Sequence, residues 1–152
     1  MEMLSRKWIK RYLGIAQEIS TWSKDPSTKV GAVVVCKSSG QILSQGYNGF
    51  PRGVVDAPEK LLNREEKLKW VVHAEMNCIY NASLAGVSLK GATLFVHGLP
   101  VCPECAKGVV QTGIDSVYMR VDTKNADVWI KKFEEVSSVM FDEVNIRYSY
   151  IV

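Results

Sequence analysis

Four residues that could do chemistry together stand in two short segments of the chain. His73 and Glu75 lie in the stretch VVHAEMNCIY, and Cys102 and Cys105 form the C-x-x-C pair of CPEC. A histidine nitrogen and two thiolates are ligands that Zn²⁺ prefers, and three protein ligands leave its fourth tetrahedral position for water, as in catalytic sites. The residue types and spacing therefore predict a Zn²⁺ site made by His73, Cys102 and Cys105.

Glu75 is the candidate acid–base group beside this metal. Residues two apart do not share a face inside a helix, so His73 and Glu75 can converge on one site only in a first turn. Two thiolates formally cancel the charge of the metal, which makes a nearby base more valuable for activating water. We expect Glu75 to take a proton from the water and to hand protons to a leaving nitrogen.

Two other interpretations of the cysteines stay open at this point. A C-x-x-C pair near alternating strands and helices can be a thiol redox pair, although that leaves the histidine and glutamate unexplained. A closed structural Zn²⁺ site could instead recruit Cys36, Cys78 or His97 as a fourth ligand. Cys36 and Cys78 stand in apolar settings typical of core cysteines. His97 ends a predicted strand, where a hydrogen-bonded scaffold or pocket role is expected.

The elements that must position these residues follow from the hydrophobic pattern. Apolar residues recur at helical spacing over 8–19, and β-prone runs at 30–36 and 41–47 indicate a hairpin whose first strand is apolar throughout, as in a central strand. A loop is expected over 48–60 and a charged, solvated helical stretch over 63–69. The remaining predicted elements are strands 91–98, 115–121 and 145–152, and helices 73–86, 103–112 and 126–140.

This order of elements predicts an α/β fold. A hairpin followed by alternating helices and strands gives a three-layer α/β/α sandwich with a mixed five-stranded sheet and helices on both faces. The chain of 152 residues, with 47% hydrophobic and 23% charged residues, fits one domain over residues 1–152. The helices that begin at 73 and 103 are expected to start at the same edge of the sheet, where open α/β sheets bind ligands.

Charge and hydropathy exclude several classes of partner and location. The net charge of +3 is spread along the chain without a basic run, which disfavours nucleic acid and membrane surfaces as partners. Basic residues from Arg6 to Arg11 interrupt the apolar residues of the N-terminal segment, so no signal peptide is expected, and no apolar stretch is long enough to span a membrane. The expected location is the reducing cytoplasm.

The metal segments carry a resemblance to a known family. HAEMN followed by LPVCPECAKGVVQTGI resembles the zinc-dependent cytidine and deoxycytidylate deaminase superfamily. The segments SKDPSTKVGAVVV at 23–35 and GYNGFPRG at 46–53 are similar to its deoxycytidylate branch, so the resemblance covers about residues 5–120. One departure is Val101, which separates Pro100 from Cys102. The two cysteines keep their spacing, so the metal site is expected to survive it.

The resemblance implies a cytidine deaminase-like fold and hydrolytic deamination of dCMP to dUMP and ammonia, which would supply dUMP for thymidylate synthesis. By resemblance, Glu75 moves the protons, Asn48 binds the sugar hydroxyls, and the backbone N–H of Ala74 holds the pyrimidine carbonyl. Lys29 and Arg120 are candidate phosphate ligands. Two further basic candidates are Arg52 and Lys124.

The resemblance also implies partners and leaves alternatives. It suggests a homo-oligomer, with a hexamer possible, and control by dCTP as activator and dTTP as inhibitor. The alternative functions are a zinc deaminase of dCTP, cytidine, deoxycytidine, cytosine or a tRNA base, and a non-enzymatic structural zinc module.

Overall fold

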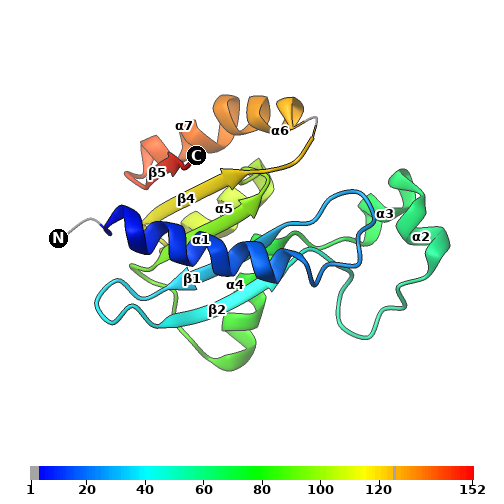
Figure 1. Ribbon diagram of the computed structural model, residues 1–152, viewed down its shortest axis with the longest axis horizontal. Helices are drawn as coiled ribbons and strands as arrows, with labels where there is room; N and C mark the ends of the chain where they lie inside the picture. Colours follow the sequence, from blue (N-terminus) through cyan, green and yellow to red (C-terminus); the bar gives the residue numbers. More distant parts are fainter. Residues whose placement is uncertain (1–3, 125) are drawn as a thin grey trace.

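The computed structural model describes residues 4–124 and 126–152, and its strands form one mixed sheet (Figure 1). The strands, in chain order, are β1 (Gly31–Val35), β2 (Ile42–Tyr47), β3 (Thr93–Gly98), β4 (Ser116–Val121) and β5 (Arg147–Tyr150). Their order in the sheet is β2-β1-β3-β4-β5. β1 is antiparallel to β2 and β3, whereas β3, β4 and β5 are parallel. The predicted domain over 1–152 includes residues 1–3 and 125, which lie outside the described residues.

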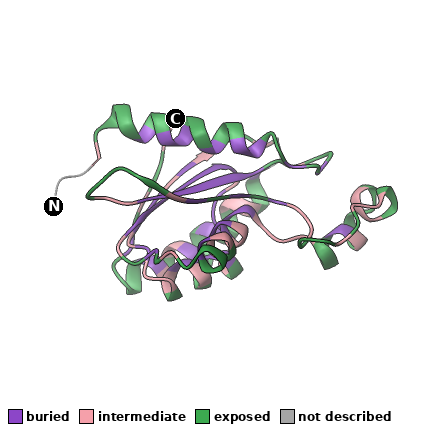
Figure 2. Cartoon of the chain, turned by 90° about the horizontal axis from the view of Figure 1, so that it is seen from below, coloured by how far each residue is buried: buried purple, intermediate pink, exposed green. Residues whose placement is uncertain are grey.

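Helices cover both faces of this sheet, as predicted. They are α1 (Arg6–Ser20), α2 (Pro58–Leu62), α3 (Arg64–Trp70), α4 (Ala74–Ala85), α5 (Pro103–Gln111), α6 (Asp127–Lys132) and α7 (Ser138–Glu143), with a π-helical segment η1 (Phe133–Ser137) between the last two. Figure 2 shows α1 on one face and most of the other helices on the opposite face. The three-layer α/β/α sandwich with five strands is therefore confirmed.

The central strand β1 separates two apolar clusters, because successive side chains of a strand point to opposite faces. Val33 and Val35 pack under α1, whereas Ala32 and Val34 face the α4 and α5 side. All five residues of β1 are buried, as expected for a central strand. Gly46 of β2 lies so close to α4 that an added Cβ would meet the backbone nitrogen of Cys78 at 2.4 Å. These contacts fix α4 tightly against the sheet.

The sheet brings the predicted site segments to one edge. Gly31, the first residue of β1, pairs with Tyr47 at the end of β2 and with His97 near the end of β3. The chain therefore leaves β2 and β3 at the same edge. The helix α5 follows β3 at this edge. Just after β2, Gly49 forms a β-bridge with Val72, which lies shortly before the start of α4. Both α4 and α5 therefore begin beside this edge, as predicted.

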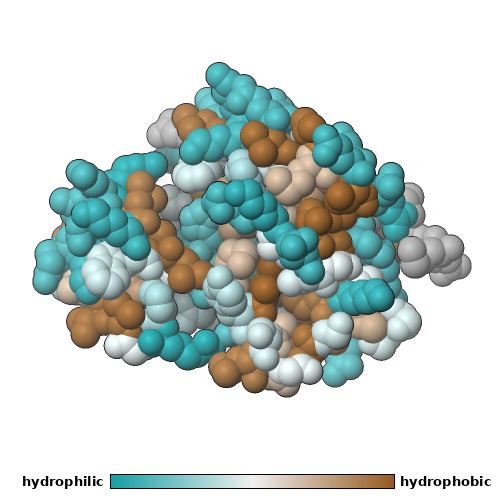
Figure 3. Space-filling view, turned by 180° about the vertical axis from the view of Figure 1, so that it is seen from behind, coloured by the Kyte–Doolittle hydropathy of each residue, from teal (hydrophilic) through white to brown (hydrophobic). Residues whose placement is uncertain are grey.

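The segment between β2 and α4 differs from its prediction. Residues 58–60, expected in a loop, begin the short helix α2, with Pro58 in its first turn. The charged stretch 63–69 corresponds to α3, but its Lys67 is buried, so it is not simply a solvated face. We call the pair α2 and α3 the side arm (Figure 1), which stands away from the sandwich. The side chains on its surface mix polar and apolar types, as the view from behind shows (Figure 3).

The last predicted helix is also modified. The expected helix over 126–140 is present but extends to Glu143, and its middle turn widens into the π-helical η1. Phe133 of η1 and Phe141 of α7 are buried in the core cluster on the α4 and α5 side. None of the helices formed by the described residues is long and apolar enough to cross a membrane.

Candidate metal centre and active site

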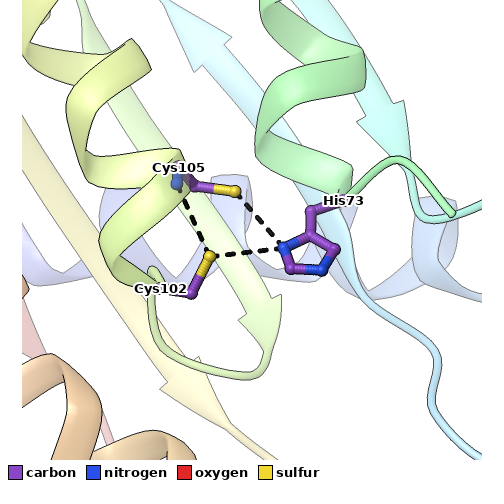
Figure 4. Close-up of side chains that lie close together, drawn as sticks. All are labelled: His73, Cys102 and Cys105. Carbon is purple, nitrogen blue, oxygen red and sulfur yellow. Dashed lines mark hydrogen bonds between the residues drawn. The ribbon is translucent and has the colours of Figure 1, made fainter. Parts of the chain in front are cut away.

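The starts of α4 and α5 present the predicted metal ligands to each other (Figure 4). His73 is the N-cap residue of α4, and Cys102 is the N-cap residue of α5, where its sulfur accepts a hydrogen bond from the backbone N–H of Cys105 at 3.5 Å. The backbone of Val72 exchanges two hydrogen bonds with Gly49, of 2.8 and 3.1 Å. This bridge holds His73 against the loop that follows β2.

The three side chains have the geometry of a zinc site. The Nδ1 atom of His73 lies 3.3 Å from Sγ of Cys102 and 3.5 Å from Sγ of Cys105. All three donor atoms lie within 4.8 Å of one another. A tetrahedral Zn²⁺ with ordinary ligand distances separates a sulfur from a nitrogen by roughly 3.5 Å. The donor set and its spacing therefore fit this metal, with Nδ1 as the histidine ligand atom.

A closed site with a fourth histidine or cysteine ligand is not supported. A shared metal needs at least three histidine, cysteine or acidic side chains close together. Within residues 4–124 and 126–152, these three residues form the one such group. Cys78 is buried one turn further along α4, and Cys36 follows β1 at the opposite edge of the sheet. His97 lies on the other face, with Nε2 at 3.6 Å from Oδ2 of Asp122. Its buried Nδ1 has no hydrogen-bond partner among the residues described, but His97 lines a groove on the α1 side of the sheet, which fits the pocket role expected for it.

The electrostatics of the two thiols differ. The pKa of Cys102 is lowered to about 4, mainly by hydrogen bonding from Cys105 and also by His73. Burial acts in the opposite direction but does not outweigh these two effects. The pKa of Cys105 is raised, because its thiol is hydrogen-bonded to Cys102 and is buried. One thiolate is therefore favoured at neutral pH, and a metal ion would displace the proton of the other.

Glu75 lies in the first turn of α4, two residues after His73, as expected for two residues that share one site. Its side chain is buried, with 4% of the residue exposed, yet it lines the cavity next to the three candidate ligands. Burial raises the pKa of Glu75 to about 7, and the charge on Cys102 adds to the rise. A carboxyl group with a pKa near neutrality can both accept and donate a proton.

The cavity beside Glu75 also contains two of the predicted substrate-binding residues, Asn48 and Ala74. The amide of Asn48 is already bonded, with Oδ1 accepting from the N–H of Val30 at 2.9 Å and Nδ2 donating to the carbonyl of Thr28 at 2.8 Å. Each of these amide atoms can make one more hydrogen bond. Ala74 begins α4, so its N–H has no partner within the helix.

The predicted phosphate ligands are not gathered in this cavity. Lys29 lines a neighbouring groove on the α1 side of the sheet, and its Nζ donates to the carbonyl of Ser23. Lys124 lines the same groove. Arg120 lines neither space, and Arg52 bonds to the side chain of Asn81. The structure thus brings together the metal ligands and Glu75 but not these basic side chains.

Val101, the residue that departs from the family pattern, packs in the core. Its side chain is fully buried, and its carbonyl accepts a hydrogen bond of 2.8 Å from Oγ of Ser137 in η1. Pro100 still lines the cavity, and Cys102 still begins α5. The additional residue therefore leaves the two cysteines together, as expected.

Sequence reasoning missed several residues of this cavity, and those with charged or aromatic side chains are Asp25, Arg64, Lys67 and Trp129. The ring of Trp129, from α6, lies edge-on to His73 with ring centroids 6.4 Å apart. Asp25 is the one with a local signal, because Asp followed by Pro-Ser-Thr favours a side-chain-capped turn, and its Oδ1 accepts from the N–H groups of Ser27 and Thr28. The other three come from charged or amphipathic helical stretches, in which nothing distinguishes a cavity residue from a surface one.

Comparisons with known proteins identify the family of this chain. The family model of the cytidine and deoxycytidylate deaminase zinc-binding region matches residues 6–121. An uncharacterised deaminase from the luxG 3′ region of Aliivibrio fischeri is 38% identical, over 95% of this chain and 94% of that protein. The deoxycytidylate deaminase of Mus musculus is 34% identical, over 94% of this chain and 90% of its own length.

A solved structure shares the whole fold. The dCMP deaminase of cyanophage S-TIM5, crystallised in complex with dCMP and dUMP, superposes with a TM-score of 0.75 at 26% identity. The match covers 98% of this chain and 100% of that one. The chain therefore belongs to the cytidine and deoxycytidylate deaminase family and is, with that family, a zinc-dependent hydrolase.

Proposed function

We propose that this chain deaminates dCMP to dUMP and ammonia, and that the dUMP is a precursor for thymidylate synthesis. The observation that carries the proposal is the buried Glu75, which lines one cavity with His73 and Cys102, two members of the cluster that Cys105 completes. The similarity to the mouse deoxycytidylate deaminase and to the phage enzyme bound to dCMP and dUMP supports this substrate.

The chemistry divides between the metal and Glu75. Zn²⁺ held by His73, Cys102 and Cys105 would lower the pKa of a water molecule and so supply the nucleophile for C4 of the cytosine ring. The Glu75 carboxylate accepts the proton of that water and delivers it to ring nitrogen N3. Glu75 then takes the remaining proton from the hydroxyl group added at C4 and carries it to the amino group. The bond between C4 and this nitrogen breaks as the C4 carbonyl forms, and the amino group leaves as ammonia. A pKa of about 7 allows both directions of transfer near neutral pH.

The walls of the cavity orient the substrate. The N–H of Ala74 donates to the carbonyl of the pyrimidine, and Asn48 uses its remaining hydrogen-bonding capacity for the sugar hydroxyls. Because the amide of Asn48 is fixed by Val30 and Thr28, it is held in place before the substrate arrives. Such preorganisation reduces the entropy lost on binding.

The test is ammonia release from zinc-loaded protein offered dCMP, dCTP, deoxycytidine, cytidine and cytosine in parallel. Turnover of dCMP above the other compounds is the expected result. Turnover of only one of the other compounds would identify that compound, instead of dCMP, as the substrate. No turnover of any of them by zinc-loaded protein would overturn the proposal and favour a tRNA base or a structural zinc site.

We also propose a homo-oligomer, with a hexamer possible, that is activated by dCTP and inhibited by dTTP. The support is the similarity to the deoxycytidylate branch alone. Repeating the dCMP assay with each nucleotide added tests the regulation, and sedimentation of the purified protein tests the oligomer. Rates that do not respond to either nucleotide would remove the regulatory part.

A further inference from the structure

Two basic side chains, Arg64 and Lys67, line the cavity beside Glu75 in the part of the chain that the structure describes. Both belong to α3 of the side arm. Nζ of Lys67 lies 3.1 Å from Oδ1 and 3.0 Å from Oδ2 of Asp25, and 3.0 Å from Oγ of Ser27. Lys67 and Asp25 are both buried, so the charge of Lys67 is neutralised where it lies.

Arg64 differs from Lys67 in each of these respects. It is exposed, and it takes part in none of the ion pairs formed by residues 4–124 and 126–152. Arg64 therefore brings an uncompensated positive charge to the rim of the cavity. A guanidinium group at such a position suits a phosphate, which it can bind through two parallel hydrogen bonds.

Arg64 also lies where the cavity meets the groove on the α1 side. Arg64, Thr28 and Trp129 line both the cavity and the groove on the α1 side. They therefore mark the junction of the two spaces. The cavity thus opens at Arg64 into a second space, which offers room for the sugar and phosphate of a nucleotide whose pyrimidine lies beside Glu75.

Other basic side chains near the cavity are already engaged or lie further away. Nζ of Lys24 pairs with Asp56 at 2.7 Å, and Lys29 donates to a backbone carbonyl. Arg52 bonds to Asn81, and Lys124 lines only the groove. Arg64 is thus the basic residue of the cavity that is free to meet a ligand, among the residues described.

The ion pair of Lys67 with Asp25 explains why Arg64 is held there. The helices of the side arm stand apart from the sandwich (Figure 1), and Lys67 is the one residue within their bounds that is buried. Its partner Asp25 is fixed by the N–H groups of Ser27 and Thr28, in the loop that precedes β1. This pair ties α3 to the wall of the cavity, one turn from Arg64.

We propose that Arg64 binds the phosphate of the substrate and so selects nucleotide over nucleoside, and that the Lys67–Asp25 pair is the positioning element that holds it over the cavity. This inference rests on the proposed deamination of a cytosine nucleotide. It identifies a specificity-determining residue that lies in the side arm, outside the metal cluster.

The decisive experiment compares dCMP with deoxycytidine as substrates of the zinc-loaded wild type and of Arg64→Gln. KM for dCMP is expected to rise about 10- to 100-fold, the range for losing a hydrogen bond to a charged group, while KM for deoxycytidine and kcat for both stay within about twofold. Calorimetric titration with dCMP gives a readout that does not need turnover, and it should show the same loss of affinity.

The matched control is Arg6→Gln, which removes an exposed arginine at the start of α1. It should leave both substrates unaffected. An unchanged preference for dCMP in Arg64→Gln would overturn the inference and leave the proposed function standing. Absence of dCMP turnover in the wild type, together with dCMP binding that does not depend on Arg64, would overturn both.

The positioning role is tested by combining Arg64→Gln with Lys67→Met in a double-mutant cycle. If Lys67 acts by placing Arg64, the loss caused by Arg64→Gln is expected to shrink at least several-fold in the Lys67→Met background. Independent, multiplicative effects on KM for dCMP would contradict this role for the ion pair.

Discussion

The metal cluster and the side arm are two regions of one cavity, but they are held in opposite ways. The cluster sits on the first residues of α4 and α5, which pack on the sheet through a buried apolar core. The side arm contributes Lys67 as its buried residue and is attached through a charged pair. Apolar packing thus holds the groups that we propose do the chemistry, whereas a polar contact holds the residue that we propose selects the substrate.

The change with the largest expected effect is Cys102→Ala, which breaks the cluster itself. Zinc should be lost and deamination should fall below detection, because two ligands cannot hold the metal in place of three. Metal content by atomic absorption and ammonia release measure the two effects. The control is Cys36→Ala, at the opposite edge of the sheet, which should keep both zinc and activity.

Glu75→Gln is expected to separate chemistry from metal binding. The amide keeps the shape of the side chain but cannot move protons, so kcat should fall by about 10² to 10⁴ while zinc content is unchanged. Glu104→Gln is the matched control, because Glu104 is also in a helix first turn but is exposed. Full activity of Glu75→Gln would show that another group moves the protons.

Lys67→Met should damage the side arm and spare the metal cluster. Removing one partner of a buried ion pair costs roughly 3 kcal/mol or more, and here the cost falls on the docking of α3. Hydrogen exchange over residues 58–70 should accelerate, while amides of α4 and α5 keep their protection and zinc stays bound. In Lys69→Met, which removes an exposed pair with Glu66, exchange should hardly change.

Acidification is expected to have a smaller, graded effect on the same contact. Burial tends to raise the pKa of Asp25, but the N–H groups of Thr28 and Ser27, together with Lys67, lower it below its ordinary value. A lowered pKa in the folded state means that the stabilisation is complete above the ordinary pKa of about 4 and is lost as the pH falls through the folded value. The protection of side-arm amides, measured relative to their intrinsic exchange rate at each pH, should therefore fall below about pH 4.

Asp25→Asn separates this effect from the release of zinc, which acid also favours because ligands are protonated. In the variant, exchange of the side arm should be faster at neutral pH and lose its acid-dependent step. A step of the same size in Asp25→Asn would assign the pH dependence to another group.

Sequence patterns are enough to predict the sandwich, the mixed sheet and the ligands of the metal cluster. These rest on local signals: apolar periodicity, turn residues, and ligand types at fixed spacing within HAE and CPEC. Residues 73 and 75 fall at a helix start by pattern alone, and the mixed sheet follows from a hairpin followed by alternating elements. Such features need no knowledge of distant contacts, so they could be predicted residue by residue. The strand order β2-β1-β3-β4-β5 is known only from the structure.

Tertiary structure alone decided which charged residues belong to the cavity. Lys67 and Lys69 stand two apart in one charged helical stretch, yet Lys67 is buried against Asp25, 42 positions earlier, and Lys69 is exposed. Lys29 and Arg120 were predicted for the phosphate but do not line the cavity, whereas Arg64 does. A long, flexible cation has no local signature of burial, because its environment is set by the segment that folds against it.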